Sequence, residues 1–152
     1  FLVSTMQAKY IGHVVFYVRN LGKSLVFYRD LLGFREVGRI FGGQAVALTT
    51  GWTHHEMLLI EVGDVSGPLQ GKRIGLYHVG IKIGDSLDEL RQAKAELESN
   101  GIPIDGVSDH VVSQSIYLRD PDGNEIEIYV DADPEIWEKE PTAVLSVKPL
   151  IL

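Results

Sequence analysis

The chain contains a weak internal repeat. The segment 12–18, Gly-His-Val-Val-Phe-Tyr-Val, is echoed by 77–83, Tyr-His-Val-Gly-Ile-Lys-Ile. Each copy leads into a helical pattern and then into three short strand patterns. Self-similarity of this kind marks a duplicated supersecondary unit. The sequence therefore predicts an α+β fold, in which two repeated βαβββ modules form a curved mixed sheet around a concave face.

Turn and linker signals bound the two modules. Module one covers about 10–63 and module two about 76–131, and the glycine-rich segment 63–72 between them is the most linker-like part of the chain. Residues 132–152 form a C-terminal extension, which begins with a short helical turn and ends in a segment expected to pack as an edge or lid. We expect all 152 residues to form a single domain. Residues 1–5 precede a methionine and are interpreted as an expression remnant.

Each module carries one amphipathic helix. In module one, apolar residues recur at helical spacing after Ser24, which we expect to begin the helix, and Gly33 ends it. In module two the apolar spacing over 87–97 is clearer, and the pair Asn100-Gly101 ends that helix. We therefore expect each helix to cover one side of its sheet and to leave the other side open.

Composition excludes several classes of protein. The net charge of −7 lacks the basic excess of a nucleic-acid-binding surface. The absence of cysteine excludes a disulfide framework, a thiolate nucleophile and a cysteine-ligated zinc site. No apolar run approaches the roughly 20 residues of a membrane span, and no basic leader with a cleavage site is visible. We expect a cytoplasmic protein without nucleic-acid or membrane partners.

Strand alternation predicts which side chains share the open face. Apolar residues at 14, 16 and 18 leave His13 on the other face of the first strand, and those at 79, 81 and 83 leave His78 there. After the turn 120–124, apolar residues at 126, 128 and 130 do the same for Glu127. Two histidines and one carboxylate form the ligand set of non-haem Fe(II) oxygenases, and the set can also hold zinc or manganese.

Each of these residues has a structural interpretation beside the functional one. A single strand histidine usually has a structural role, but His13 and His78 stand at equivalent points of a repeat, which favours a metal site. Glu61 and Glu125 are interpreted as charges at the rim. Alternation over 55–62, with apolar positions 58, 60 and 62 taken as the core row, favours His55 over its neighbour as the inward histidine.

These segments resemble the vicinal oxygen chelate superfamily, which includes glyoxalase I, fosfomycin-resistance transferases, bleomycin-binding proteins and extradiol ring-cleaving dioxygenases. The resemblance covers about 10–131. The strands at His13 and His78 are similar to the ligand-bearing first strands of that family, and 120–127, Asp-Pro-Asp-Gly-Asn-Glu-Ile-Glu, is similar to its last strand. The resemblance implies that His13, His78 and Glu127 bind Fe(II), with Mn(II) as the substitute.

A more specific pattern resembles the signature of type I extradiol dioxygenases. It consists of His110, Tyr117 and the turn and strand that end at Glu127. This resemblance implies that His110 and Tyr117 line the substrate pocket and that His55, the second of two adjacent histidines, acts on bound dioxygen. Ser108 departs from the residues usual at its position, and we expect the extra non-catalytic domain of the classical enzymes to be missing. The chain therefore resembles a short, one-domain member.

The resemblance implies Fe(II)-dependent ring cleavage of a catechol-type aromatic diol with O2, in which His55, Tyr117 and His110 are the catalytic residues. A metal-dependent glyoxalase-like isomerase or thiol transferase is an open alternative, with Glu61 as its extra carboxylate. A small-molecule-binding resistance protein of the same fold is another. The particular catechol and the number of subunits stay open, although this fold often pairs into homo-oligomers.

Overall fold

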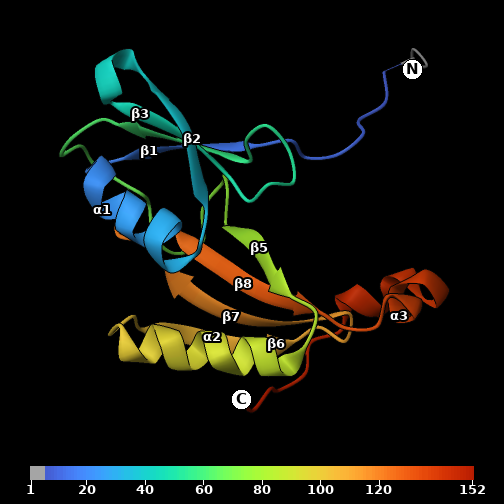
Figure 1. The fold of residues 1–152 in the computed structure, drawn as a ribbon. Helices are drawn as coiled ribbons and strands as arrows, with labels where there is room; N and C mark the ends of the chain where they lie inside the picture. Colours follow the sequence, from blue (N-terminus) through green and yellow to red (C-terminus); the bar gives the residue numbers. More distant parts are fainter. Residues whose placement is uncertain (1–5) are drawn as a thin grey trace. The chain divides into compact units, whose positions relative to one another are not determined.

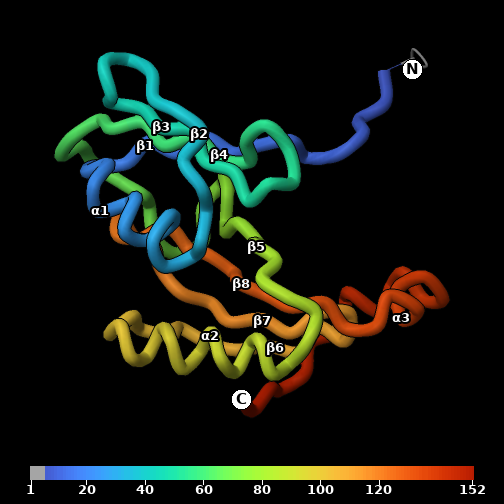
Figure 2. Tube along the Cα trace, viewed as in Figure 1, coloured from blue at the N-terminus to red at the C-terminus, as the bar shows by residue number. Residues whose placement is uncertain are grey.

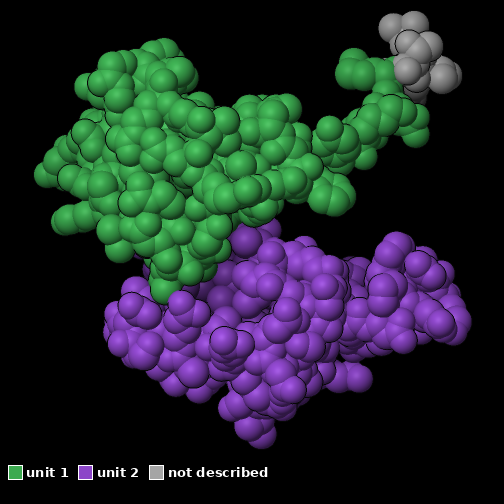
Figure 3. Space-filling view, in the orientation of Figure 1, with its two compact units in different colours: residues 1–67 green, residues 68–152 purple. Residues whose placement is uncertain are grey.

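A computed structural model of the chain describes residues 6–152, so the proposed expression remnant at 1–5 lies outside the described residues. The chain divides into two compact units, with unit 1 ending at Gly67 and unit 2 running from Pro68 to Leu152 (Figure 3). The division falls inside the linker-like segment 63–72. Each unit contains one mixed four-stranded sheet and its own helix (Figure 1), which confirms the predicted α+β class.

Unit 1 follows the order strand, helix and three strands. Its elements are β1 (Val14–Val18), α1 (Leu21–Leu25), the π-helical turn η1 (Val26–Leu31), β2 (Arg35–Ile40), the 3₁₀ turn η2 (Phe41–Gly43), β3 (Ala45–Thr49) and β4 (Met57–Glu61). The strands lie in the order β1-β4-β3-β2, and β1 runs parallel to β4 while the other pairs are antiparallel. Figure 2 labels these four strands along the trace of the chain.

Unit 2 repeats the same connectivity. Its elements are β5 (His78–Gly84), α2 (Leu87–Ser99), β6 (Ile104–Asp109), β7 (Ser113–Arg119), β8 (Glu125–Asp131), α3 (Pro134–Lys139) and the 3₁₀ turn η3 (Pro141–Leu145). The strands lie in the order β5-β8-β7-β6, again with only the first and last strands of the module parallel. The predicted βαβββ repeat is therefore confirmed.

The buried face of β4 differs from the prediction. Met57 and Leu59 are buried, whereas Leu58 and Ile60 are only half-buried. The parallel register explains the difference, because it pairs Leu59 with Phe16 on the buried face of β1. Four consecutive apolar residues obscure the alternation, so the predicted core row of Leu58, Ile60 and Val62 is wrong, and Val62 is exposed.

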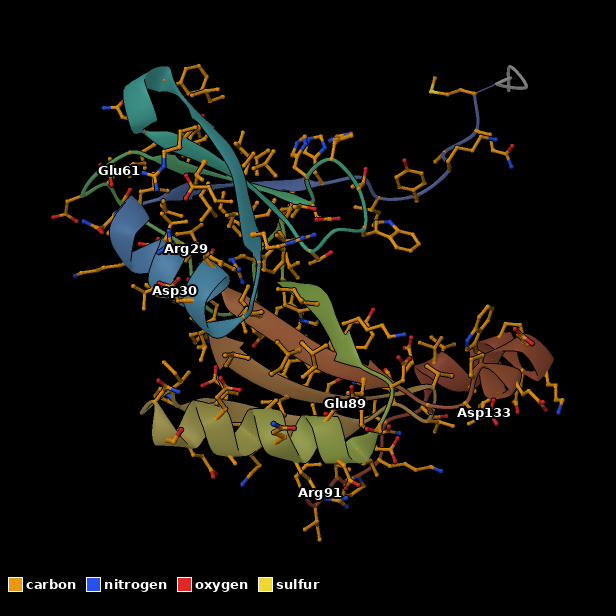
Figure 4. The ribbon with its side chains drawn as sticks, viewed as in Figure 1. Arg29, Asp30, Glu61, Glu89, Arg91 and Asp133 are labelled. Carbon is orange, nitrogen blue, oxygen red and sulfur yellow. The ribbon has the colours of Figure 1, made fainter. Side chains whose placement is uncertain are left out.

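The helix of unit 1 begins at Leu21 rather than at Ser24, which lies buried inside it. The Asn20 side chain accepts a hydrogen bond from the Lys23 N–H and caps the first turn. The Leu21 N–H donates to the Glu61 carboxylate at 2.6 Å, near the start of α1 (Figure 4). These acceptors satisfy N–H groups that a helix start leaves without partners.

Helix α2 has the boundaries that its sequence predicts. Ser86 accepts a hydrogen bond from the Glu89 N–H, and the Glu89 carboxylate accepts hydrogen bonds from the Ser86 hydroxyl and the Asp85 N–H, so the two side chains together cap the first turn. Leu90 and Leu97 are fully buried against the sheet, and the helix is capped at Asn100. No helix in residues 6–152 is long and apolar enough to cross a membrane. Helix α2 thus packs on one face of the unit 2 sheet, and the opposite face carries polar side chains.

The C-terminal extension pairs with the edge of the unit 2 sheet. The predicted helical turn is present as α3, which Asp133 caps at its first turn. Further along, Lys148 forms an antiparallel bridge with Asp109, the last residue of edge strand β6. The end of the extension therefore packs as an edge at this point, as the sequence predicts.

Candidate metal and substrate site

The face of the unit 2 sheet opposite α2 brings polar side chains together across three strands. The parallel register pairs His78 with Glu125 and Gly80 with Glu127, and the antiparallel register pairs Glu127 with Tyr117. Alternation on β8 buries its isoleucines on the helix side, so both of its glutamates face the other way. This row of side chains is the centre of the candidate site.

The two oxygens of Glu127 have different surroundings. Oε1 accepts hydrogen bonds from the Ser115 hydroxyl and, at 3.3 Å, from the Tyr117 hydroxyl. Oε2 lies 3.2 Å from Nε2 of His78. The Glu127 side chain is only 15% exposed. Oε1 therefore accepts hydrogen bonds from two neutral hydroxyl groups, while Oε2 lies next to an imidazole nitrogen.

His78 lies between two carboxylates. Its Nδ1 is 3.1 Å from Oε2 of Glu125, whose side chain is 9% exposed. A carboxylate on one ring nitrogen fixes the tautomer and orientation of a ligand histidine and leaves the other nitrogen available. Glu125 was interpreted as a rim charge, and the structure corrects this: it is a largely buried partner of His78.

The donor pair fits a hard or borderline divalent metal. Two ligands at right angles, each about 2.1 Å from a metal, lie about 3.0 Å apart, close to the 3.2 Å between His78 Nε2 and Glu127 Oε2. Gly80 lies opposite Glu127, and a Cβ at this position would be in ordinary contact with that oxygen at 3.5 Å. Within residues 6–152, however, no three His, Asp or Glu side chains are grouped as a ready metal site. Unit 2 thus supplies two of the three predicted metal ligands, His78 and Glu127.

Tyr117 links Glu127 to His110. Its hydroxyl lies 2.8 Å from Nε2 of His110, which follows β6 directly. Burial, and then the charge of Glu127 and the hydrogen bond to it, raise the pKa of Tyr117 to about 12. The phenol therefore keeps its proton at neutral pH and can act as a hydrogen-bond donor.

Unit 1 contains a cluster of three histidines. The rings of His13 and His55 have centroids 4.7 Å apart, and Nδ1 of His54 lies 2.6 Å from Nδ1 of His55. Burial, and then the neighbouring His54 and His13, lower the pKa of His55, so this ring is neutral at neutral pH. His55 lies in the connection between β3 and β4, so strand alternation does not orient it. Its contact with His13 places it nevertheless beside a predicted ligand.

The predicted site residues form two groups, one in each unit. Unit 1 brings together His13 and His55. Unit 2 brings together His78, His110, Tyr117 and Glu127.

Alternation over 115–118 places Ser115 on the site side of its strand together with Tyr117, but sequence reasoning missed the role of Glu125. Glu125 alternates in phase with Glu127 and is the register partner of His78, so a correct pairing of the first and last strands would have identified it. The role of Ser115 follows from its neighbour relation to Glu127 across β7 and β8.

Comparison with known proteins identifies the family. Residues 10–128 match the model of the Glyoxalase/Bleomycin resistance protein/Dioxygenase superfamily. Because this match covers most of the chain, the chain belongs to that superfamily. The superfamily contains both enzymes and proteins without enzymatic activity.

Individual relatives differ in activity and length. The chain is similar to the catechol-2,3-dioxygenase of Bacillus subtilis (strain 168), with 34% identity over 140 residues that make up 91% of this chain and 47% of that protein. The chain thus spans about half the length of this relative. It is also 28% identical over 150 residues to a probable trivalent organoarsenical cleaving enzyme of the same organism, with 93% and 92% of the two chains covered.

A solved structure shares the fold. The glyoxalase/dioxygenase from Nostoc punctiforme superposes with a TM-score of 0.72, covering 86% of this chain and 99% of that one at 21% identity. At this level of identity the comparison supports the architecture of paired βαβββ modules and says nothing about the reaction.

Proposed function

We propose that the chain is a dioxygenase that cleaves the ring of a catechol-type aromatic diol beside its hydroxyl groups, with His13, His78 and Glu127 as ligands of one Fe(II). Mn(II) is the expected substitute. The proposal is carried by the group His110, Tyr117 and Glu127, in which one protonated phenol contacts both a histidine and a ligand carboxylate. The similarity to a catechol-2,3-dioxygenase supports the choice of reaction.

The reaction is balanced without a further reductant. The ring carbon–carbon bond next to the diol breaks, both atoms of O2 enter the product, and the electrons that reduce O2 come from the diol. When bound, Fe(II) supplies a redox-active centre at which the diol and O2 react. Zinc has no redox chemistry and cannot supply it.

The residues around the ligands have separate tasks. Tyr117, with a pKa raised to about 12, donates a hydrogen bond to a substrate oxygen as charge develops there. His110 orients the Tyr117 hydroxyl and the diol, since it lies 2.8 Å from that hydroxyl. His55 is neutral at neutral pH because its pKa is lowered, so it can accept a proton from the substrate and return it later.

Two observations weigh against the competing reactions. Glu61, the extra carboxylate that a glyoxalase-like enzyme would use, accepts a hydrogen bond from the start of α1 and has a structural task. The chain also lacks cysteine, so it offers no thiolate for a soft trivalent arsenical. Glu61 therefore already has a structural contact, and thiolate chemistry has no candidate residue in this sequence.

Oxygen uptake tests the proposal. Protein loaded with Fe(II) under anaerobic conditions is mixed with O2 and a panel of catechols, and we expect at least one to give a yellow, pH-sensitive ring-opened product. Tyr117→Phe should lower kcat about 10- to 100-fold with a smaller change in substrate binding, because the hydroxyl acts on charge formed in the transition state.

The control is Tyr129→Phe. Tyr129 lies on the neighbouring strand β8 and is half-buried, and this substitution leaves the hydrogen bonds of Tyr117 in place. The proposal is contradicted if no catechol causes oxygen uptake and the protein instead catalyses isomerisation or thiol addition in the presence of Zn, Ni or Mn. The chain would then be a glyoxalase-like enzyme.

A further inference from the structure

Unit 2 contains a cavity next to the candidate site. Its volume is about 560 Å³, which is within the usual range for small-molecule sites. The lining residues are Gly71, Lys72, Arg73, Tyr77, Arg119 and Glu125. Apart from Glu125, none of these residues has a role in the sequence analysis, and the proposed ligands and catalytic residues are not among them.

The cavity has an excess of positive charge. Arg119 is paired, because its Nε lies 2.6 Å from Asp105 and its guanidinium lies 3.5 Å from Glu125. Lys72 and Arg73 have no carboxylate of the described residues within ion-pair distance. A chain with a net charge of −7 has no general surplus of cations, so this local excess is a property of the cavity.

Arg73 is held in place by backbone carbonyls. Its two terminal nitrogens donate to the carbonyl oxygens of Gly71 and Leu76, both at 2.9 Å. A guanidinium has five N–H donors, so about three remain available after these two bonds. A positioned guanidinium with free donors matches the planar geometry of a carboxylate.

The segment that carries Lys72 and Arg73 is fixed to the sheet of the same unit. The Gln70 amide donates to the Gly123 carbonyl at 3.3 Å, and Arg119 donates to the Gln70 side-chain oxygen at 2.9 Å. The cations are thus presented by an anchored segment rather than by a free loop.

Two lining residues connect the cavity to the candidate metal pair. The Tyr77 ring has its centroid 4.8 Å from that of His78, and Glu125 contacts Nδ1 of the same histidine at 3.1 Å. A ligand in the cavity therefore lies beside a proposed metal ligand and against an aromatic ring. The cavity combines a surface for an aromatic group with cations for an anion.

We propose that this cavity binds the carboxylate of the substrate, so that the preferred substrate is an aromatic diol with a carboxylate-bearing substituent. The inference rests on the proposed dioxygenase function and adds the class of diol. Lys72 and Arg73 bind the carboxylate, while Tyr77 contacts the carbon skeleton between the carboxylate and the diol.

Anaerobic binding measurements test the inference on the iron-loaded protein. Dissociation constants are measured by calorimetry for dihydroxyphenylacetate and for methylcatechol, which lacks the carboxylate. We expect the carboxylated diol to bind about 10-fold more tightly or better, which is the usual worth of a hydrogen-bonded charge. Arg73→Gln should remove most of this preference, and Lys72→Gln should reduce it on the order of 3-fold. Lys94→Gln, on the solvent side of α2, is the matched control and should change nothing.

Three outcomes separate the possible explanations. Equal affinity for the two diols, or an unchanged preference in both Lys72→Gln and Arg73→Gln, overturns the inference. Inorganic phosphate that competes as well as dihydroxyphenylacetate also overturns it, because the cavity would then be a general anion site. Phenylacetate that binds wild-type protein and loses affinity in both variants, without oxygen uptake on any diol, would uphold the carboxylate site and reject the dioxygenase function.

Discussion

The two units have the same backbone plan and different chemistry. In each, the first strand is parallel to the last, and a histidine directly precedes a valine of the first strand: Val14 pairs with Met57, and Val79 pairs with Ile126. In the last strand, the residue that follows Met57 in unit 1 is Leu58, and the residue that follows Ile126 in unit 2 is Glu127. One copy of the repeat thus carries an apolar side chain where the other carries a carboxylate.

This difference shows how a duplicated module can specialise. Unit 1 collects three imidazoles, while unit 2 surrounds its first-strand histidine with carboxylates and hydroxyls. The additional histidines come from different turns: His54 and His55 from the connection between β3 and β4, and His110 from the turn between β6 and β7. The backbone of the repeat is kept, and its turns and one open-face position supply the separate functions.

The strongest test of this asymmetry removes its carboxylate. Glu127→Ala should abolish Fe(II) binding, which we expect at one ion per wild-type chain, because a divalent metal loses its only anionic ligand. The fold should persist, since the side chain lies off the buried face of β8. Metal analysis after anaerobic loading measures the first effect, and circular dichroism checks the second. Full occupancy in Glu127→Ala would show that the metal lies elsewhere.

A second test concerns the imidazoles of unit 1. His55→Phe should retain Fe(II) and bind the diol, yet lower turnover on the order of 10²- to 10⁴-fold, the usual effect of removing a positioned proton-transfer group. His54→Phe is the matched control, because His54 is exposed and adjacent in sequence. Loss of iron in His55→Phe would make this residue a ligand, and equal turnover in both variants would leave it without a catalytic role.

A smaller effect is expected from the carboxylate behind His78. Glu125→Gln keeps the size of the side chain but weakens the acceptor for Nδ1 of His78, so Fe(II) affinity should fall by about 10-fold. Competition with a chromophoric chelator measures the affinity. Glu98→Gln on α2 controls for the loss of one negative charge. An unchanged affinity would limit Glu125 to its ion pair with Arg119.

The smallest effect concerns the stability of the connection that carries His54 and His55. Glu56 accepts hydrogen bonds from the Thr50 and Thr53 N–H groups, both at 2.7 Å. Burial alone would raise the pKa of Glu56, but these bonds outweigh it and lower the pKa below its usual 4.5. The stabilisation is therefore present above about pH 4.5 and is lost as the pH falls through the lowered value.

Glu56→Gln should consequently destabilise the protein by about 1 kcal/mol at neutral pH, and the difference from wild type should shrink in acid. Urea unfolding followed by circular dichroism at both pH values measures it. A difference that is the same in acid and at neutral pH would mean that packing, not the ionised carboxylate, stabilises the connection.

Sequence predicted those parts of the fold that depend on local signals. Ser86 and Asn100 mark both ends of α2 by their capping chemistry. In unit 1, Asn20 and Ser24 are both good N-cap residues, and only the packing that buries Ser24 decides between them. The face of β4 was equally ambiguous, because its core residues have apolar neighbours.

The sequence predicts those site residues whose position depends on strand alternation. It does not predict those whose position depends on how the strands pair. His78 and Glu127 each lie opposite an apolar row, so their shared face follows from the sequence. The role of Glu125 requires its pairing with His78 across parallel strands, which are 47 residues apart and carry no local signal for that pairing. The contact of His55 with His13 likewise depends on the path of an irregular connection.

The bridge between Lys148 and Asp109 bears on solubility. Strand β6 is one of the two outer strands of its sheet, and an open strand edge is a template for pairing with another chain and for aggregation. The segment around Lys148 occupies that edge at Asp109, and β2, an outer strand of the other sheet, carries the charged residues Arg35, Glu36 and Arg39 instead. One of these two edges is thus covered by a bound segment and the other by charge, so the residues around Lys148 help to keep folded molecules apart at β6.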